Sequence, residues 1–261
     1  MTLYLHARDA RSPEPILGDQ FAGPVLDRID HDFERLDKLV GNKPLIISRA
    51  KAIDEITRTF LLDHPDAVVL HLGCGLDSRV QRIDPDPTVA WFDLDQEPVI
   101  DLRRRLVGDR AGVTMLAASV TESGWWSKVP DGRPTIILGE GLLMYLPRAG
   151  VKALIDAALS RSSLPRQVLV FDTVAPWVRR VSQWQVNFRE TGNRFLSTSG
   201  DLDTAIAGHD HVTLVDERSM VTLARRASTG SLAAIIGAID TIPAGHRAMV
   251  RRTYSHQRST D

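Results

Sequence analysis

The chain has 261 residues, of which 43% are apolar and 25% are charged, as in an ordinary globular domain. This composition excludes collagen-like, coiled-coil and wholly disordered chains. Lys and Arg total 32 against 33 Asp and Glu, so the net charge of −1 creates no basic field that would attract nucleic acid or an anionic membrane. We therefore expect neither as a partner.

Cysteine usage and the amino terminus bear on location. Cys74 is the single cysteine, so no intramolecular disulfide and no cysteine-based zinc site can form. The histidines and acidic residues show no clustered ligand spacing, and we predict no metal. The first residues lack the apolar stretch of a signal peptide, and the apolar runs are only as long as strands. A cytoplasmic protein is expected.

The first 65 residues predict a helical cap. Residues 16–39 carry apolar side chains at spacings of three and four, the pattern of an amphipathic helix. A second helix is expected over residues 45–62, and Pro65 would end it.

From residue 66 to 175, short apolar runs alternate with helical stretches, as in βα units around a parallel sheet. Helices are expected at 97–107 and 148–159. The five expected strands cover residues 67–72, 89–94, 113–117, 135–139 and 168–171. This alternation predicts a doubly wound α/β fold with a cofactor-binding core.

The last third departs from this pattern. Residues 176–202, with Trp177, Trp184 and Phe188, predict an insertion over the ligand edge of the sheet. Two final strands are expected over residues 211–215 and 231–239. The polar tail, residues 251–261, is expected to fray.

Taken together, the elements predict one domain over residues 1–261. Its parts are the cap (1–65), the core (66–175), and the insertion with the acceptor side (176–261). The sheet should be Rossmann-like and hold seven strands, the last pair antiparallel.

A glycine turn is the strongest local signal. The strand at 67–72 runs into Gly73 and Gly75, which let the chain turn sharply and approach a ligand closely; a tight turn without a ligand is the alternative. Asp95 ends the next strand, where an acid can accept hydrogen bonds from ribose hydroxyls. Asp93, two residues earlier, is the structural alternative. A nucleoside-containing cofactor is predicted.

Two neighbouring residues bear on which cofactor this is. Ser78 stands where a nicotinamide-binding loop has its third glycine. Asp77 would start the next helix and repel a pyrophosphate. S-adenosylmethionine carries no phosphate, so both residues favour a methyltransferase over a nicotinamide-dependent oxidoreductase.

A family resemblance rests on three segments, VVLHLGCGLDSRV, VAWFDLDQEPVI and IILGEGLLMYLP. They resemble the leucine carboxyl methyltransferase-like family of class I S-adenosylmethionine-dependent methyltransferases, and most of all its bacterial polyketide O-methyltransferases. The segments LYLHARDARSPEPILGDQFAGPVLDRIDHDF and ISRAKAIDEITRTFL resemble the helical cap of that branch. The resemblance covers roughly residues 3–172. It implies S-adenosyl-L-methionine as cofactor and a small-molecule methyl acceptor, such as a polyketide or another secondary metabolite.

For the adenosine half of the cofactor, the resemblance assigns Gly73 and Gly75 to the turn and Asp95 to the ribose. The family usually has an aspartate after the third strand to meet the adenine amino group. This chain has Ser119 there, so the Ser119 hydroxyl and the Val120 backbone are the expected replacements, with some loss of affinity unless something compensates.

For the methionine half, the resemblance places Arg49 against the carboxylate, with Arg8 as a second basic group nearby. A pairing of Arg49 with Asp54 on the helix surface is the alternative. Glu140 matches the acid beside the methionine portion; a carboxylate directly after an apolar strand is costly to bury without a partner such as an ammonium group. Tyr145 could line the sulfonium pocket or simply pack in the core.

Several functional questions stay open at this stage. A phenol acceptor must lose a proton, for which a general base can serve, whereas a carboxylate arrives ionised; no histidine is assigned as that base. A protein carboxyl methyltransferase remains an alternative, as does an inactive methyltransferase-fold binding module, which the serine at position 119 would suit. The arginines at 103–105 are expected on the solvent face of a helix. The oligomeric state is not predicted.

Overall fold

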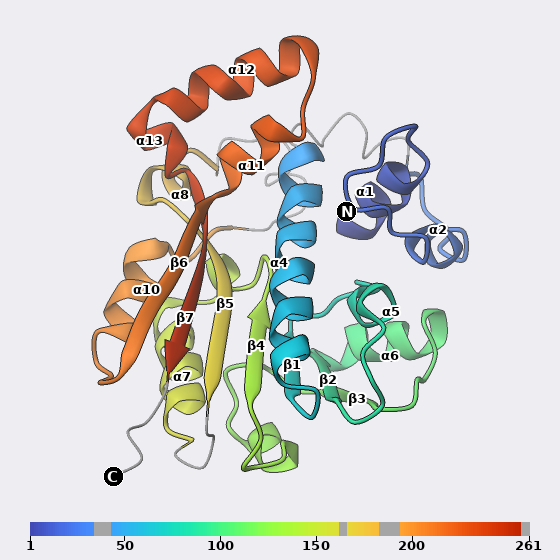
Figure 1. The fold of residues 1–261 in the computed structure, drawn as a ribbon, viewed down its shortest axis with the longest axis vertical. Helices are drawn as coiled ribbons and strands as arrows, with labels where there is room; N and C mark the ends of the chain where they lie inside the picture. Colours follow the sequence, from blue (N-terminus) through green and yellow to red (C-terminus); the bar gives the residue numbers. More distant parts are fainter. Residues whose placement is uncertain (34–42, 162–165, 183–193, 257–261) are drawn as a thin grey trace.

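The structure is a computed structural model that describes residues 1–33, 43–161, 166–182 and 194–256 (Figure 1). Within these residues lies a seven-stranded sheet in the order β3-β2-β1-β4-β5-β7-β6. β1 to β5 are parallel, and β7 runs antiparallel to both β5 and β6. The strands are β1 Val68–Leu72, β2 Ala90–Asp95, β3 Val113–Ala117, β4 Thr135–Gly139, β5 Gln167–Val174, β6 Val212–Ser219 and β7 Met249–His256.

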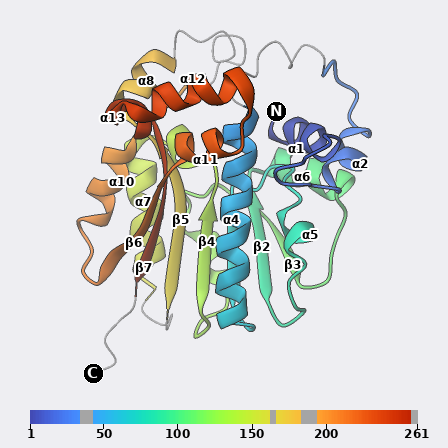
Figure 2. The same cartoon turned by 45° about the horizontal axis from the view of Figure 1, so that its top comes forward.

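Helices surround this sheet (Figures 1 and 2). Two short 3-10 helices, Gly124–Lys128 and Leu143–Tyr145, complete the connections. The α-helices are α1 Thr2–Ala10, α2 Ala22–Leu26, α4 Lys43–Asp63, α5 Arg79–Ile83, α6 Glu97–Leu106, α7 Arg148–Leu159, α8 Pro176–Ser182, α10 Ser199–Ile206, α11 Met220–Arg226, α12 Gly230–Thr241 and α13 Pro243–His246.

The sheet separates two apolar layers. Alternate residues of the inner strands point to opposite faces. Because both faces are covered, β1, β4 and β5 are buried throughout. One face packs against α4 and α5, through side chains such as Ile53, Phe60 and Val80. The other face packs against α7 and α10, through Leu154 and Leu202 among others. The carboxyl ends of the parallel strands therefore meet at one edge, where ligands bind in folds of this kind.

The described part of the N-terminal helical range differs from the expected amphipathic helix over residues 16–39. Within residues 16–33 only α2 is α-helical. The Asp9 carboxylate accepts hydrogen bonds from the backbone N–H groups of Ile16, Leu17 and Gly18, which bends this stretch into a turn. Residues 34–39 lie outside the described part. The second expected helix is confirmed as α4.

The final strand lies elsewhere than expected. Residues 231–239 are helical, within α12, and the strand is β7, over a stretch expected to fray. β7 lies between β5 and β6, and its Arg251 and Arg252 are paired with Asp216 and Glu217 of β6. Charged residues that find partners inside a sheet can form a strand without an apolar run. The expected antiparallel last pair is confirmed with this new partner.

The expected insertion is described only in part. Trp177 lies on α8, where it donates a hydrogen bond to the Ala244 carbonyl, 3.1 Å away. Trp184 and Phe188 lie outside the described residues. None of the helices in the described ranges is long and apolar enough to cross a membrane.

Candidate functional site

The glycine turn links β1 to α5 at the carboxyl edge of the sheet. Gly73 and Gly75 have φ angles of +64° and +52°, in the left-handed region that glycine adopts without strain. A Cβ on Gly73 would lie 3.1 Å from the side chain of Leu142, whereas a Cβ on Gly75 would meet nothing within 4 Å. The missing side chain of Gly73 therefore leaves room for Leu142, which follows β4, and Gly75 borders open space that a ligand could use.

Asp95 contacts this turn directly. Its Oδ2 accepts a hydrogen bond from the Gly75 N–H at 2.8 Å, and its Oδ1 accepts one from Gln96. The Ala118 N–H donates to the Asp95 carbonyl, so the residues after β3 lie beside the end of β2. The carboxylate is half-buried and keeps acceptor capacity toward solvent.

Asp93 is the structural member of the pair, as its alternative role suggested. It is fully buried, accepts hydrogen bonds from Arg103, and is also bonded to His71 and Trp91. Burial raises the pKa of Asp93, but the attraction of Arg103 and the His71 hydrogen bond outweigh it and hold the pKa below its usual value.

Arg103 departs from the expected solvent-facing arginine run, whereas Arg104 and Arg105 are exposed as expected. The Arg103 side chain is fully buried, and its guanidinium pairs with Asp93 at 2.5 Å. Nη1 also donates to the carbonyls of Gly75 and Asp77, at 3.2 and 2.6 Å, so Arg103 binds the backbone of the glycine turn. Its spacing from Ile100 and Leu106 on one face of α6 was the available signal.

Arg49, on α4, reaches across to the ends of β4 and β5. Its Nε donates to Glu140 Oε1 at 2.9 Å, and its Nη1 donates to Asp172 Oδ2 at 3.0 Å. Burial alone would lower the pKa of Arg49, but Asp172 and Glu140 raise it above its usual value, so the group stays charged. The alternative partner, Asp54, binds Arg79 and Arg82 instead.

Glu140 has partners within the chain. Arg49 binds one of its carboxylate oxygens and Arg79 binds the other. The partner that burial was expected to require is therefore present within the chain, as two guanidinium groups, and burial alone does not call for an ammonium-bearing ligand. Burial raises the pKa of Glu140, but Arg49 and Arg79 lower it to about 2, so the carboxylate is ionised at neutral pH.

Asp172 and Gly141 belong to this cluster and were missed from the sequence. Gly141 has φ +61°, and its N–H donates to Asp172 Oδ1 at 2.5 Å. A Cβ at Gly141 would lie 3.2 Å from Arg49 Nη2. Asp172 is fully buried, and burial raises its pKa above the usual value despite Arg49. The second glycine of the motif GEG was the only available signal.

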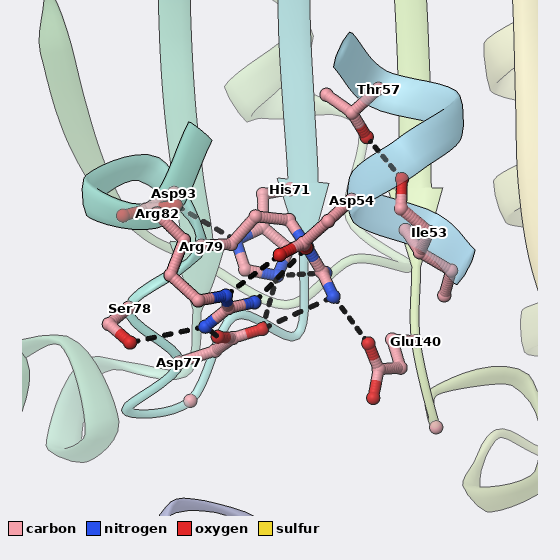
Figure 3. Close-up of polar contacts among 12 residues, drawn as sticks. Ile53, Asp54, Thr57, His71, Asp77, Ser78, Arg79, Arg82, Asp93 and Glu140 are labelled. Carbon is pink, nitrogen blue, oxygen red and sulfur yellow. Dashed lines mark hydrogen bonds and ion pairs between the residues drawn. The ribbon is translucent and has the colours of Figure 1, made fainter. Parts of the chain in front are cut away.

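A second ionic cluster fastens α5 to α4 (Figure 3) and to the segment between α1 and α2. Arg82 binds Asp54, Asp77 and Asp19 at 2.6–2.9 Å. The Asp19 carboxylate, after α1, also accepts a hydrogen bond from Ser78 at 2.5 Å. The charge of Asp77 is therefore compensated by arginine, and the argument that it would repel a pyrophosphate no longer holds.

One trio in this cluster has the spacing of metal ligands. Donor atoms of His6, Asp19 and Asp77 lie within 4.8 Å of one another. Arg82 Nη1, however, already donates to both carboxylates. A guanidinium supplies the positive charge here, so among the described residues this trio is explained without a metal.

Three further predicted residues, Ser119, Val120 and Arg8, make contacts outside these ionic clusters. Ser119 shares a hydrogen bond with the Thr121 hydroxyl at 2.8 Å, and the Val120 side chain is buried in the core. Arg8 is exposed on α1, with its guanidinium 5.8 Å from the ring centre of Tyr4. Their roles toward a cofactor stay predictions.

Tyr145 lies near the methionine side of the predicted site. It is 41% exposed, and its ring centre lies 5.4 Å from that of Phe195. Burial raises its pKa, with Arg49 acting in the opposite direction. This partly open aromatic contact differs from packing in the core, and its role toward a ligand stays a prediction.

A cavity of about 770 Å³ lies away from this site, between α4 and the half of the sheet formed by β5, β7 and β6. Its lining includes Phe60 of α4, Val168 of β5 and Arg251 of β7. A smaller cavity of about 280 Å³ lies beside Asp54 and Arg82, under the turn that follows α1.

Sequence comparison identifies relatives. The profile of the family described as leucine carboxyl methyltransferase matches residues 1–159. The tetracenomycin polyketide synthesis O-methyltransferase TcmP of Streptomyces glaucescens is 42% identical over 194 residues, which cover 74% of this chain and 71% of TcmP. The S-adenosyl-L-methionine-dependent methyltransferase dpfgK of Gibberella zeae is 34% identical over 59% of this chain and 57% of its own.

Solved structures share the fold. A candidate methyltransferase from Thermobifida fusca superposes with a TM-score of 0.60 at 16% identity, over 97% of this chain and 94% of its own. The N-methyltransferase NodS of Bradyrhizobium japonicum gives a TM-score of 0.53 at 11% identity, over 84% of this chain and all of its own. The fold and the sequence relatives agree: the chain belongs to the leucine carboxyl methyltransferase family and is an S-adenosylmethionine-dependent methyltransferase.

Proposed function

We propose that this protein is an O-methyltransferase that transfers the methyl group of S-adenosylmethionine to a hydroxyl or carboxyl oxygen of a small molecule of the polyketide class. The acceptor class rests on the 42% identity to TcmP, whose name assigns it to polyketide synthesis. We further propose that the chain works as one methyltransferase domain, with residues 1–65 as its cap and residues 176–261 on the acceptor side, in the cytoplasm.

The observation that carries the proposal is the arrangement of charges at the carboxyl edge of the sheet. A cationic group, Arg49, and an ionised acid, Glu140, lie together where β4 ends, and Asp95 lies at the glycine turn. A carboxylate ligand would bind the Nη2 side of Arg49, an ammonium would bind Glu140, and ribose hydroxyls would donate to Asp95. The residues present therefore suit the amino-acid and ribose ends of this cofactor.

The bound cofactor would supply an electrophilic methyl group on a positively charged sulfur. The protein's own contribution is orientation, because methyl transfer needs the acceptor oxygen in line with the sulfur–methyl bond. Arg49 and Glu140 would hold one end of the cofactor and Asp95 the other, which fixes the direction of the methyl group. Tyr145 can face the positive sulfur with its ring, since aromatic faces attract cations.

The family description, leucine carboxyl methyltransferase, favours a second candidate, a protein carboxyl methyltransferase that acts on a leucine carboxylate. The two candidates differ in what the acceptor needs. A peptide carboxylate arrives ionised, whereas a phenol must lose a proton during the reaction.

Calorimetric titration with S-adenosylmethionine and S-adenosylhomocysteine, with NAD and NADP as comparators, tests the cofactor. We expect saturable one-to-one binding of the first pair alone. Methyl transfer is then measured with labelled cofactor and three acceptors: a hydroxylated aromatic polyketide, an aromatic carboxylic acid and a peptide ending in leucine.

The outcomes are distinct. Transfer to either small molecule supports the proposal, and the preferred one separates hydroxyl from carboxyl acceptors. Transfer to the peptide alone would replace it with the second candidate. Cofactor binding without transfer to any acceptor would indicate a binding module, and binding of a nicotinamide cofactor alone would overturn the assignment.

A further inference from the structure

Arg79 is a buried, fully paired side chain near the predicted cofactor site, and the function proposed above gives it no role. It begins α5, directly after the glycine turn, and is fully buried. Nε donates to Asp54 Oδ1 at 2.8 Å, and Nη2 donates to Glu140. One side chain thus connects α4, α5 and the end of β4 (Figure 3).

Arg79 also pairs with Asp77, whose Oδ2 lies 3.4 Å from Nη2, and a further contact, with His71, fixes its orientation. Nη1 lies 3.1 Å from His71 Nε2, and a guanidinium can only donate. His71 Nε2 must therefore be the acceptor, which places the imidazole proton on Nδ1, 3.0 Å from Asp93. An aspartate, a neutral imidazole and a guanidinium form a line that ends on Glu140, and each group fixes the next.

Arg79 also determines how Glu140 meets Arg49. One carboxylate oxygen of Glu140 binds Arg49 Nε and the other binds Arg79, so Glu140 bridges two arginines. Without Arg79, the second oxygen would be free to turn to Arg49 and complete a side-on bidentate pair through Nε and Nη2. That pair would occupy the nitrogen that faces Gly141 and that a ligand carboxylate would need.

We propose that Arg79 is a positioning residue: it draws one oxygen of Glu140 away from Arg49 and so keeps Arg49 open for the cofactor carboxylate. This inference rests on the proposed function, because it assumes that the methionine end of the cofactor binds at Arg49 and Glu140. It assigns Arg79 no contact with the cofactor. Loss of Arg79 must therefore weaken the binding of ligands that carry the amino-acid end and leave the binding of ligands that lack it unchanged.

The test compares S-adenosylhomocysteine with adenosine, which lacks the amino-acid end, by calorimetry on wild type, Arg79→Met and Arg79→Lys. We expect Arg79→Met to weaken S-adenosylhomocysteine binding about tenfold, the effect of one charge-assisted contact, while adenosine binding changes less than about twofold. Arg79→Lys keeps the charge and should recover part of the loss. This variant also carries the test if Arg79→Met does not fold.

Arg161→Met is the matched control. Arg161 is largely buried and donates to the carbonyls of Trp126 and Val129, away from the cofactor edge. It should lower thermal stability and leave the affinities for both ligands unchanged.

Equal weakening of both ligands in the folded Arg79 variants would make Arg79 merely structural and overturn the inference. Unchanged S-adenosylhomocysteine affinity would overturn it as well. A wild-type protein that binds neither ligand would instead refute the proposed function on which the inference rests.

Discussion

Arg79 and Arg103, toward one end of the sheet, and Arg252, toward the other, are held in different ways. Around β1, β2 and β4, Arg79 and Arg103 are fully buried and meet buried carboxylates. On β7, at the other end, Arg252 pairs with Glu217 and Asp203, whose side chains are 33% and 56% exposed. Charges removed from water need a partner in a fixed place, whereas exposed pairs can rearrange. The charged groups of the first region are therefore held in fixed positions.

Removal of a buried arginine should expose this contrast most strongly. We expect Arg103→Met to lower the free energy of unfolding by about 3–5 kcal/mol, because Asp93 would stay buried without its cation. Arg252→Met is the matched change at the other end and should cost less than about 1 kcal/mol. Urea denaturation measures both, and similar losses in the two variants would contradict the contrast.

Acid should destabilise the fold through the first region, because carboxyl groups there have lowered pKa values that protonation must overcome. The pKa of Glu140 is about 2 in the folded protein, against 4.5 as its ordinary value. Between these values the unfolded chain binds more protons than the folded one, so stability is full above about pH 5 and is lost as pH falls toward 2.

The contribution of Glu140 is at most about 3 kcal/mol. Glu140→Gln should flatten the fall of unfolding free energy between pH 5 and 2. Denaturation at a series of pH values measures this slope, and an unchanged slope would show that Glu140 is not the group responsible.

Loss of the Asp95 carboxylate should act on binding. Asp95→Ala removes the acceptor of the Gly75 N–H and the proposed ribose contacts, so S-adenosylmethionine affinity should fall by about 1–3 kcal/mol. Asp101→Ala, on the exposed side of α6, is the control and should leave the affinity unchanged. Unchanged titration of Asp95→Ala would remove Asp95 from the site.

Two glycines allow a finer test. Gly141 and Gly132 both have positive φ, so an alanine at either should cost about 1–2 kcal/mol of stability. Only at Gly141 would the new Cβ press on Arg49; at Gly132 it meets nothing within 4 Å. Cofactor affinity should therefore fall in Gly141→Ala alone, and an equal fall in Gly132→Ala would point to strain as the cause.

The sequence predicted the core strands because their residues are apolar on both faces, as at Ile136 and Ile137. It failed where buried residues are charged. Arg103 shares the buried face of α6 with Ile100 and Leu106, but hydrophobic patterns cannot show that a buried carboxylate, Asp93, lies opposite to pair with it. The polar β7 was missed for the same reason.

The apolar stretch over residues 231–239 led to the opposite error, the prediction of a buried strand. The residues of α12 resembled a buried strand, yet Ile235 and Ile239 are 59% and 43% exposed on a helix. For the site, motif residues such as Gly73 and Glu140 could be named, but their partners could not. Asp172 and Arg79 come close to Arg49 and Glu140 only through the fold.

The Asp19 carboxylate ties the amino-terminal segment to the helix that follows the glycine turn, through Ser78 and Arg82. Opening of the amino-terminal segment breaks this tie and withdraws a partner from Ser78 and Arg82, beside the turn that borders the proposed cofactor. The two events then share one free energy, so a ligand that stabilises the turn must oppose opening of the cap by the same amount. Release of the cofactor and loosening of the amino terminus become reciprocal, although Asp19 and Ser78 are 59 residues apart in the sequence.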